Sequence, residues 1–289
     1  MTAVPDVAAA APWPVPDGLR IIEVKGYPLA YRDEGAGPPI VLLHGSLSDS
    51  RSWSLQIPEF AKRFRVFALN LRHYYPEPWD GSGDDFSVAQ HADDVAAFIG
   101  CVGLGRVHLI GHSRGGAVAL TVARRHPGLV RTLVLADPRG LESLLADTPE
   151  TRDMATQLAA SFAGLHLNLA AGDIDRAARE FVDALAGPGA WERRSPELKR
   201  IFLDNLATAV DTGESPAVAC ADIARLDFPV LLVTGEKSPQ RYGEMFAAMR
   251  VCNAAIPPPV RIPGAAHAMH RDNPAAFDAV ALEFLARND

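Results

Sequence analysis

Short apolar runs recur along the chain, separated by segments of mixed polarity. Five of these runs are almost wholly apolar, as expected for strands that are buried on both faces of a sheet. They occupy residues 39–43, 66–69, 107–110, 132–136 and 229–233. A further strand is predicted at 260–262. An antiparallel hairpin is predicted at 20–33, where apolar and polar positions alternate around Lys25–Gly26.

Segments with the apolar spacing of an amphipathic helix lie between these runs. They cover residues 52–64, 87–101, 114–126, 241–249 and 274–286. Strands that alternate with helices indicate an α/β fold with a doubly wound, mainly parallel sheet. In such a sheet, ligands bind at the carboxyl ends of the strands.

The alternation stops between residues 141 and 224, where Ala-rich helical patterns replace it. One of these helices begins at Ser195–Pro196, an N-cap followed by proline at the first helical position. We interpret 141–224 as a helical cap inserted into a core made of residues 19–140 and 225–289. Residues 1–18 contain acids but no base and no long apolar run, so they are predicted to form a flexible N-terminal arm rather than a secretory signal.

The composition narrows the class of protein. The 289 residues are 48% hydrophobic and 22% charged, which is ordinary for a globular protein. A net charge of −7 argues against nucleic-acid binding, and no apolar stretch is long enough to span a membrane. The three cysteines, Cys101, Cys220 and Cys252, are scattered and odd in number. We interpret them as reduced thiols in a cytoplasmic protein.

One stretch carries the clearest chemical signal. The apolar run at 107–110 leads into Gly111–His112–Ser113–Arg114–Gly115, a Gly-x-Ser-x-Gly motif, and a helical pattern follows at once. A serine at the turn between a strand and a helix is the arrangement of a nucleophile elbow. A side chain at Gly111 or Gly115 would crowd the strand against the helix. The free N–H groups at the start of the helix face any negative charge that develops beside the serine.

A nucleophilic serine needs a base, an acid that orients the base, and donors for the oxyanion. His267 is the candidate base, because it follows the strand at 260–262 in a loop of small residues. The candidate oxyanion donors are the backbone N–H groups of Ser46, which follows His44–Gly45, and of Arg114.

Together these motifs resemble the α/β-hydrolase superfamily, in its capped subgroup, from about residue 20 to the C-terminus. The resemblance rests on His44–Gly45, the elbow at 111–116, the inserted helical segment, Gly264–His267 and Pro274. It implies an α/β-hydrolase fold, Ser113 as nucleophile, His267 as general base and no cofactor. The motifs are specific for the fold and the nucleophile, but not for the substrate.

The acid of the triad has two candidates. Most members of this superfamily carry an aspartate in a Gly-x-x-Asp turn after the seventh strand, whereas this chain has Gly235–Glu236–Lys237–Ser238 there. A minority place the acid directly after the sixth strand, where this chain has Asp137. We predict Asp137 as the acid, with Glu236 as the alternative.

A serine at the elbow argues against haloalkane dehalogenases and epoxide hydrolases, which use aspartate there. The predicted reaction is hydrolysis, through an acyl-enzyme, of a small to medium, largely apolar carboxylic ester or lactone. That substrate class follows from the Ala-rich cap and the aromatic pocket candidates. Two alternatives remain: a C–C bond hydrolase acting on diketones, and a ligand-sensing or scaffold protein with little turnover.

The predicted pocket residues are Trp53, Tyr74, Trp79 and His112, and the Arg114 side chain is a candidate contact for a substrate carboxylate. No metal is predicted, because the pair His267 and His270 lacks a helical His-Glu-x-x-His arrangement and a third ligand. The expected partner is a small-molecule acyl substrate. The expected assembly is a monomer or a small homo-oligomer.

Overall fold

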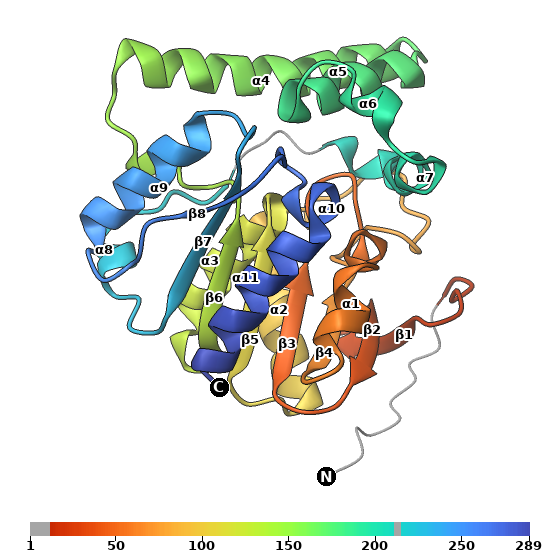
Figure 1. Cartoon of the computed structure of the whole chain (residues 1–289). Helices are drawn as coiled ribbons and strands as arrows, with labels where there is room; N and C mark the ends of the chain where they lie inside the picture. The colour runs from red at the N-terminus through yellow and green to blue at the C-terminus, as the bar shows by residue number, and fades with distance from the viewer. Residues whose placement is uncertain (1–11, 211–214) are drawn as a thin grey trace.

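The computed structural model describes residues 12–210 and 215–289. Its centre is an eight-stranded sheet with the strand order β1-β2-β4-β3-β5-β6-β7-β8 (Figure 1). β1 (Arg20–Val24) and β2 (Tyr27–Gly35) form the predicted hairpin, and β2 also pairs antiparallel with β4. All other neighbouring strands are parallel. The prediction of a mainly parallel sheet is therefore confirmed.

The remaining strands are β3 (Pro39–Leu43), β4 (Arg65–Leu69), β5 (Val107–His112), β6 (Val130–Ala136), β7 (Val230–Gly235) and β8 (Val260–Ile262). The β3 strand shows why the central strands are almost wholly apolar. Val41 and Leu43 belong to one hydrophobic cluster, and Ile40 and Leu42 belong to another. Successive side chains of a strand point to opposite faces, so a strand covered on both faces must be apolar at every position.

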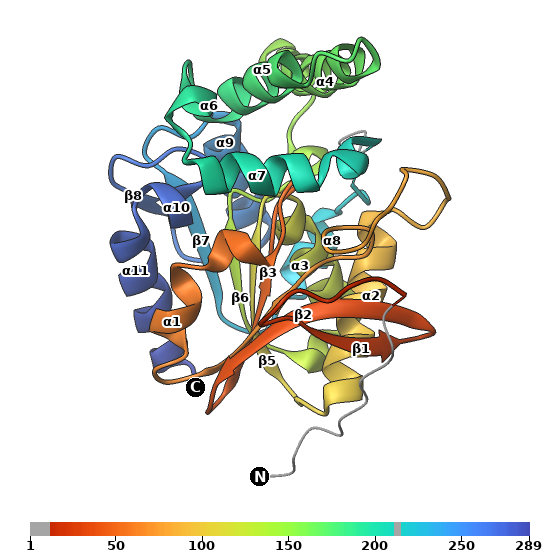
Figure 2. The same cartoon turned by 90° about the vertical axis from the view of Figure 1, so that its right-hand side faces the viewer.

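Two helical layers cover the two faces of the sheet (Figures 1 and 2). The first cluster joins one face to α2 (Val88–Val102), α3 (Arg114–Arg125) and α9 (Arg241–Cys252). The second joins the other face to α1 (Gln56–Phe60) and α11 (Pro274–Arg287). A short α10 (Met269–Asp272) precedes α11.

The predicted helix at 52–64 is shorter than expected. The chain instead forms a 3-10 turn, η1 (Ser50–Trp53), followed by α1. Pro58 explains the break, because it has no N–H to donate to the carbonyl of Ser54 and so prevents one continuous helix. The carboxylate of Asp49 caps η1 by accepting the Arg51 N–H.

Four helices lie over the carboxyl ends of the parallel strands (Figures 1 and 2). They are α4 (Pro149–Ala170), α5 (Ile174–Ala186), α6 (Ala190–Arg193) and α7 (Pro196–Asp204). They share a hydrophobic cluster of their own, which includes Phe162, Phe181, Trp191 and Phe202. By contrast, α8 (Cys220–Ala224) lies against α9, beside the core sheet. The division into a core and a cap at 141–224 remains our proposal, as does the N-terminal arm, most of which lies outside the described residues.

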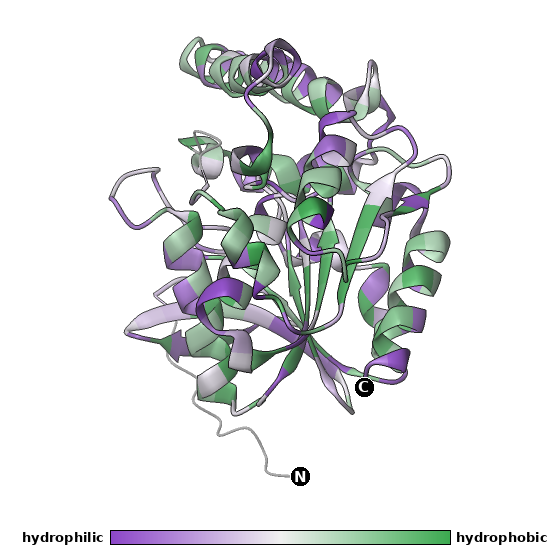
Figure 3. Cartoon of the chain, turned by 90° about the vertical axis from the view of Figure 1, so that its left-hand side faces the viewer, coloured by the Kyte–Doolittle hydropathy of each residue, from purple (hydrophilic) through white to green (hydrophobic). Residues whose placement is uncertain are grey.

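Hydropathy follows these layers. The strands at the centre of the sheet are the most uniformly apolar part of the ribbon, and polar residues gather on the outer helices (Figure 3). The longest helix, α4, buries only Phe162 and Leu165 among its 22 residues. Across residues 12–210 and 215–289, none of the helices combines the length and the apolar character needed to cross a membrane.

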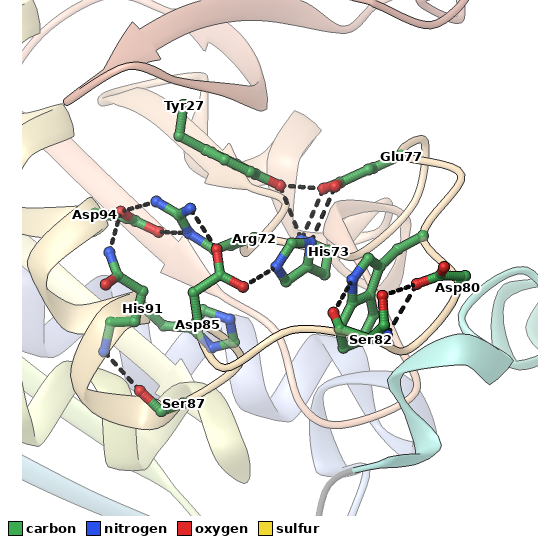
Figure 4. A network of polar contacts seen from close by, with 12 residues as sticks. Tyr27, Arg72, His73, Glu77, Asp80, Ser82, Asp85, Ser87, His91 and Asp94 are labelled. Atoms are coloured by element: carbon green, nitrogen blue, oxygen red, sulfur yellow. Dashed lines mark hydrogen bonds and ion pairs between the residues drawn. The ribbon is translucent and has the colours of Figure 1, made fainter.

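The long loop after β4 is held by a polar network (Figure 4). Both ring nitrogens of His73 donate to carboxylates, Nδ1 to Glu77 at 2.9 Å and Nε2 to Asp85 at 2.7 Å. Burial alone would lower the pKa of His73, but the bonds to the two acids outweigh it and raise that pKa. Arg72 joins the same network to α2 through two hydrogen bonds to Asp94. The loop is therefore fixed by charged side chains, with His73 as an imidazolium.

Cys220 and Cys252 form a disulfide bond, with Cα atoms 5.0 Å apart. The bond joins the start of α8 to the end of α9, whereas Cys101 is free and exposed. The prediction that all three cysteines are reduced is therefore wrong. The sequence did not reveal the pairing, because the two residues are 32 positions apart and meet only through the packing of α8 on α9.

Candidate active site

Ser113 occupies the turn between β5 and α3 with a positive φ of 52° and a ψ of −117°, a backbone conformation that residues other than glycine rarely adopt. A Cβ atom at Gly111 would lie 2.3 Å from the carbonyl oxygen of Gly115, and one at Gly115 would lie 2.3 Å from that of Leu43. Neither position tolerates a side chain. The glycines thus allow the close approach of strand and helix that holds Ser113 in a strained turn.

His267 lies in the loop after β8, and its ring meets Asp137. The Nδ1 atom is 3.3 Å from Asp137 Oδ2, and both side chains are buried. Asp137 follows β6 directly and also has a positive φ, 41°. Its Oδ2 accepts a second hydrogen bond, 2.6 Å long, from Ser238 Oγ. Ser238 stands where most members of the superfamily carry the aspartate of the Gly-x-x-Asp turn. That position therefore contacts Asp137, the proposed acid of this chain.

Electrostatics oppose charge on both members of this pair. Burial raises the pKa of Asp137 to about 7, although hydrogen bonds from Ser238 and Thr234 act in the opposite direction. Burial lowers the pKa of His267 well below its usual range, and the positive charges of Arg241, Arg194 and Arg139 lower it further. A neutral imidazole that donates Nδ1–H to the carboxylate is the form that these surroundings favour.

Glu236, the alternative acid, points elsewhere. Its side chain is exposed, and Oε2 accepts the backbone N–H of Gly264 at 2.7 Å. The structure therefore brings Asp137, and not Glu236, to the imidazole ring. The Glu236 side chain is instead bonded to the backbone of the loop that carries His267.

His112, the residue before Ser113, supports the loop that carries His267. Its Nε2 donates to the backbone carbonyl of His267 at 2.8 Å, and the two rings are 4.7 Å apart. Burial and the charge of His267 lower the pKa of His112 to about 3, so its ring is neutral. With Nε2–H donating, its Nδ1 is unprotonated and faces Gly45.

The two candidate oxyanion donors flank Ser113. A Cβ on Gly45 would lie 3.2 Å from Ser113 Cβ, so the segment that carries Ser46 passes close to the serine. Arg114 is the first residue of α3, where backbone N–H groups have no partner in the preceding helical turn. The Ser46 side chain accepts a 3.2 Å hydrogen bond from Arg139.

A cavity of about 580 Å³ opens beside these residues. Ser46, Ser113, His112 and His267 line it on the side of the sheet. Helices α4, α5 and α7 contribute an apolar wall of Leu158, Phe162, Phe181, Val182, Leu185 and Phe202. The size and lining are typical of a site for a small organic molecule.

Of the predicted pocket residues, only His112 lines the cavity. Trp53 is fully buried against the His270 ring, 4.4 Å away, and belongs to the core under α11. Tyr74 packs on the His44 ring at 4.6 Å, and Trp79 stacks on His73 at 4.2 Å. These three side chains do not line the cavity, because aromatic residues near strand ends can pack sideways into the core or the loop.

The Arg114 side chain is also outside the cavity. It is buried, with its guanidinium 4.4 Å from the Phe86 ring centre and 3.5 Å from His91 Nδ1. Other arginines line the cavity instead, among them Arg139, Arg194 and Arg241. Arg139 could have been suspected from its place two residues after Asp137, but nothing in the helical segment marked Arg194.

No metal centre was found in the part of the chain that the structure describes, where no three His, Cys, Asp or Glu side chains converge suitably. Tyr242 also contacts His267. Its ring stacks on the imidazole, with the ring centroids 5.1 Å apart and the ring planes 10° from parallel. This contact was not predicted. It orients the ring from the side of α9.

The chain is similar in sequence to several known hydrolases. The chain is 27% identical over 229 residues to (E)-2-((N-methylformamido)methylene)succinate hydrolase from Acinetobacter baylyi, covering 76% of this chain and 80% of that protein. It is 34% identical over 136 residues to 2-hydroxymuconate semialdehyde hydrolase from a Pseudomonas strain, covering 45% and 47%. It spans only 36% of the length of the uncharacterised Mycobacterium proteins that it also matches.

Among solved structures, carboxylesterase CesB from Bacillus subtilis is similar, with a TM-score of 0.73 and 20% identity, over 94% of this chain and 93% of that one. At this level of identity, the similarity is one of fold. The model of the Alpha/beta hydrolase family matches residues 40–280, which is most of the chain and includes both Ser113 and His267. The chain therefore belongs to the Alpha/beta hydrolase family.

Proposed function

We propose that this protein is a serine hydrolase with Ser113 as nucleophile, His267 as general base and Asp137 as the acid that orients it. The observation that carries this proposal is the 3.3 Å contact between His267 Nδ1 and Asp137 Oδ2, beside a serine held in an elbow. With Nδ1–H donated to the carboxylate, His267 Nε2 keeps its lone pair and is available to accept the serine proton.

In the proposed reaction, Ser113 Oγ attacks the acyl carbonyl carbon while His267 takes its proton. The backbone N–H groups of Ser46 and Arg114 stabilise the oxyanion of the tetrahedral intermediate. The intermediate expels the alkoxide, which leaves as an alcohol with the proton from His267. A water molecule, deprotonated by His267, then attacks the acyl-enzyme and releases the carboxylic acid and free Ser113.

The proposed substrate is a small to medium carboxylic ester or lactone. The apolar wall of Phe162 and Phe181 supports an acyl group of largely apolar character. C–C bond hydrolysis of a diketone is the second candidate, and it is favoured by the similarity to 2-hydroxymuconate semialdehyde hydrolase. A ligand-sensing or scaffold protein with little turnover is the third candidate.

The proposed partner is a small-molecule acyl substrate, bound by a monomer or a small homo-oligomer without a cofactor. For location, the Cys220–Cys252 disulfide is the relevant observation. Such bonds are rare in a reducing cytoplasm. The disulfide therefore favours an oxidising compartment over the cytoplasm that the scattered cysteines suggested.

The proposal is tested by turnover of 4-nitrophenyl esters, simple lactones and a vinylogous diketone, for the wild type and for Ser113→Ala. Hydrolysis of the esters or lactones that disappears with Ser113→Ala is the expected result. Cleavage of the diketone alone would favour the second candidate. Absence of turnover on all three classes, with folded protein, would leave the third.

A further inference from the structure

The cavity beside Ser113 is lined by more cationic than acidic side chains. Among the described residues that line it, six side chains are cationic and two are acidic. The cations are Arg139, Arg193, Arg194, Lys237, Arg241 and Arg271, and the acids are Glu142 and Asp272. The whole chain has a net charge of −7, so this excess is a local feature and not a reflection of composition.

The two acids are engaged by the backbone. Glu142 Oε2 accepts the N–H of Gly140 at 2.7 Å, and Asp272 Oδ2 accepts the N–H of Ala266 at 2.8 Å. Within the part of the chain that the structure describes, neither carboxylate forms an ion pair with Arg194, and only the charge of Asp272 acts on it. The positive charge of this arginine is therefore not neutralised by contact with them.

Arg194 is the cation with the fewest contacts among those that are buried or partly buried, since Lys237 is exposed. It lies between α6 and α7, partly buried, and its guanidinium forms no hydrogen bond or ion pair with any residue that the structure describes. Burial lowers its pKa, the charge of Asp272 raises it, and that of Arg271 lowers it. By contrast, the neighbouring Arg193 is exposed and donates to the Pro188 carbonyl at 2.9 Å. A cation withdrawn from water without a partner costs free energy, which an anionic ligand would recover.

The unpartnered charge acts on the reaction centre. Arg139, Arg194 and Arg241 line the same cavity as His267, and the charge of each lowers the pKa of that imidazole. Arg139 bonds to the side chain of Ser46, the proposed oxyanion residue. An anion bound among these groups would lie beside the scissile bond.

We propose that the cavity is built for substrates that carry an ionised acidic group, typified by a carboxylate, in addition to the bond that is cleaved. Arg194 is the principal contact, and the charges of Arg139 and Arg241 add to the attraction. The planar fork of an arginine matches a carboxylate with two parallel hydrogen bonds. This inference rests on the proposed hydrolase function and refines its substrate from a largely apolar ester to one with an apolar part and an acidic end.

A matched pair of esters tests the inference. The 4-nitrophenyl ester of succinic acid is compared, as the free acid and as its methyl ester, by the ratio of the two kcat/KM values. Hydrogen bonds to a charged group predict that the wild type prefers the anionic ester by about ten- to a hundredfold. Arg194→Gln is expected to lower that ratio by at least about tenfold. Arg200→Gln, the matched control at an exposed arginine of α7 outside the cavity, is expected to keep it.

Two results would overturn the inference while leaving a serine hydrolase. One is hydrolysis of both esters by the wild type with no preference, and the other is an unchanged ratio in Arg194→Gln. If neither ester is hydrolysed, calorimetric titration of the Ser113→Ala protein decides the inference separately. Monomethyl succinate is expected to bind about tenfold or more tightly than dimethyl succinate, with the difference lost in Arg194→Gln. Equal binding, or no binding of either, would refute the anionic site.

Discussion

Replacing the acid of the proposed triad tests the site most quantitatively. Asp137→Asn keeps the size of the side chain and its contact with Ser238, but removes the negative charge beside His267. Without that charge, the imidazolium that forms when His267 accepts the serine proton is no longer stabilised. An asparagine amide can also donate to Nδ1, which favours the wrong tautomer.

The size of the effect follows from the geometry. Opposite unit charges separated by 3.3 Å attract by about 5 kcal/mol at the effective dielectric constant of about 20 that suits buried protein sites. That energy corresponds to a factor of somewhat more than about 10³ in rate. The same substitution in a Ser-His-Asp triad lowers kcat by about 10⁴. We therefore expect kcat to fall by between about 10³ and 10⁴.

The assay is best run at pH 8.5, because burial raises the pKa of Asp137 to about 7 and the carboxylate must be ionised. For the same reason, kcat/KM of the wild type should fall as the pH drops below about 7 and the His267–Asp137 dyad takes up a proton. In Asp137→Asn, the acid limb should move to lower pH, where the imidazole alone titrates.

Glu236→Gln is the control, since Glu236 reaches only the Gly264 backbone, and it should cost less than about tenfold. A larger loss in Glu236→Gln than in Asp137→Asn, with both variants folded, would refute the assignment of the acid.

Three further predictions concern the acid, the loop and the disulfide. Ser238 Oγ lies 2.6 Å from Asp137 Oδ2, so an aspartate at position 238 can take over the role of Asp137. Adding Ser238→Asp to Asp137→Asn should raise turnover by about tenfold or more over the single variant. No gain in ester hydrolysis would contradict this. The pKa of His73 is raised on folding, so its stabilisation is complete below its unfolded pKa of about 6.5 and is lost as the pH rises through the folded pKa. Thermal melts at pH 6 and pH 9 should show this loss in the wild type and not in His73→Asn, and parallel melts would refute it. Cys220→Ser opens a loop of 32 residues and should lower the free energy of unfolding by about 3–4 kcal/mol. Cys101→Ser, at a free cysteine, should leave it almost unchanged. Equal urea unfolding midpoints for the two variants would contradict this.

Much of the fold could be predicted from local patterns. The buried strands could be recognised because both faces of the sheet are covered, so every position in β3 is apolar. The elbow could be recognised because Gly111 and Gly115 lie where two backbone segments approach each other closely. Only glycine fits at such positions. Both signals lie within a few residues of sequence.

The features that were missed depend on contacts between distant segments. Trp53 has the composition of a pocket residue, and only the packing of α1 against α10 and α11 decides that it belongs to the core. The Cys220–Cys252 bond depends on how α8 meets α9. Arg194 has a role only through the cavity that α6 and α7 close over the sheet, which no local pattern describes.

The central claim is that Ser113 is an activated nucleophile with a working oxyanion site. The most direct measurement is the intact mass of the protein after incubation with a fluorophosphonate, for the wild type and Ser113→Ala side by side. We expect a single adduct on the wild type that is absent from the variant. A wild type that remains unmodified while folded, with a small probe that passes the cavity entrance, or an adduct that persists in Ser113→Ala, would contradict it.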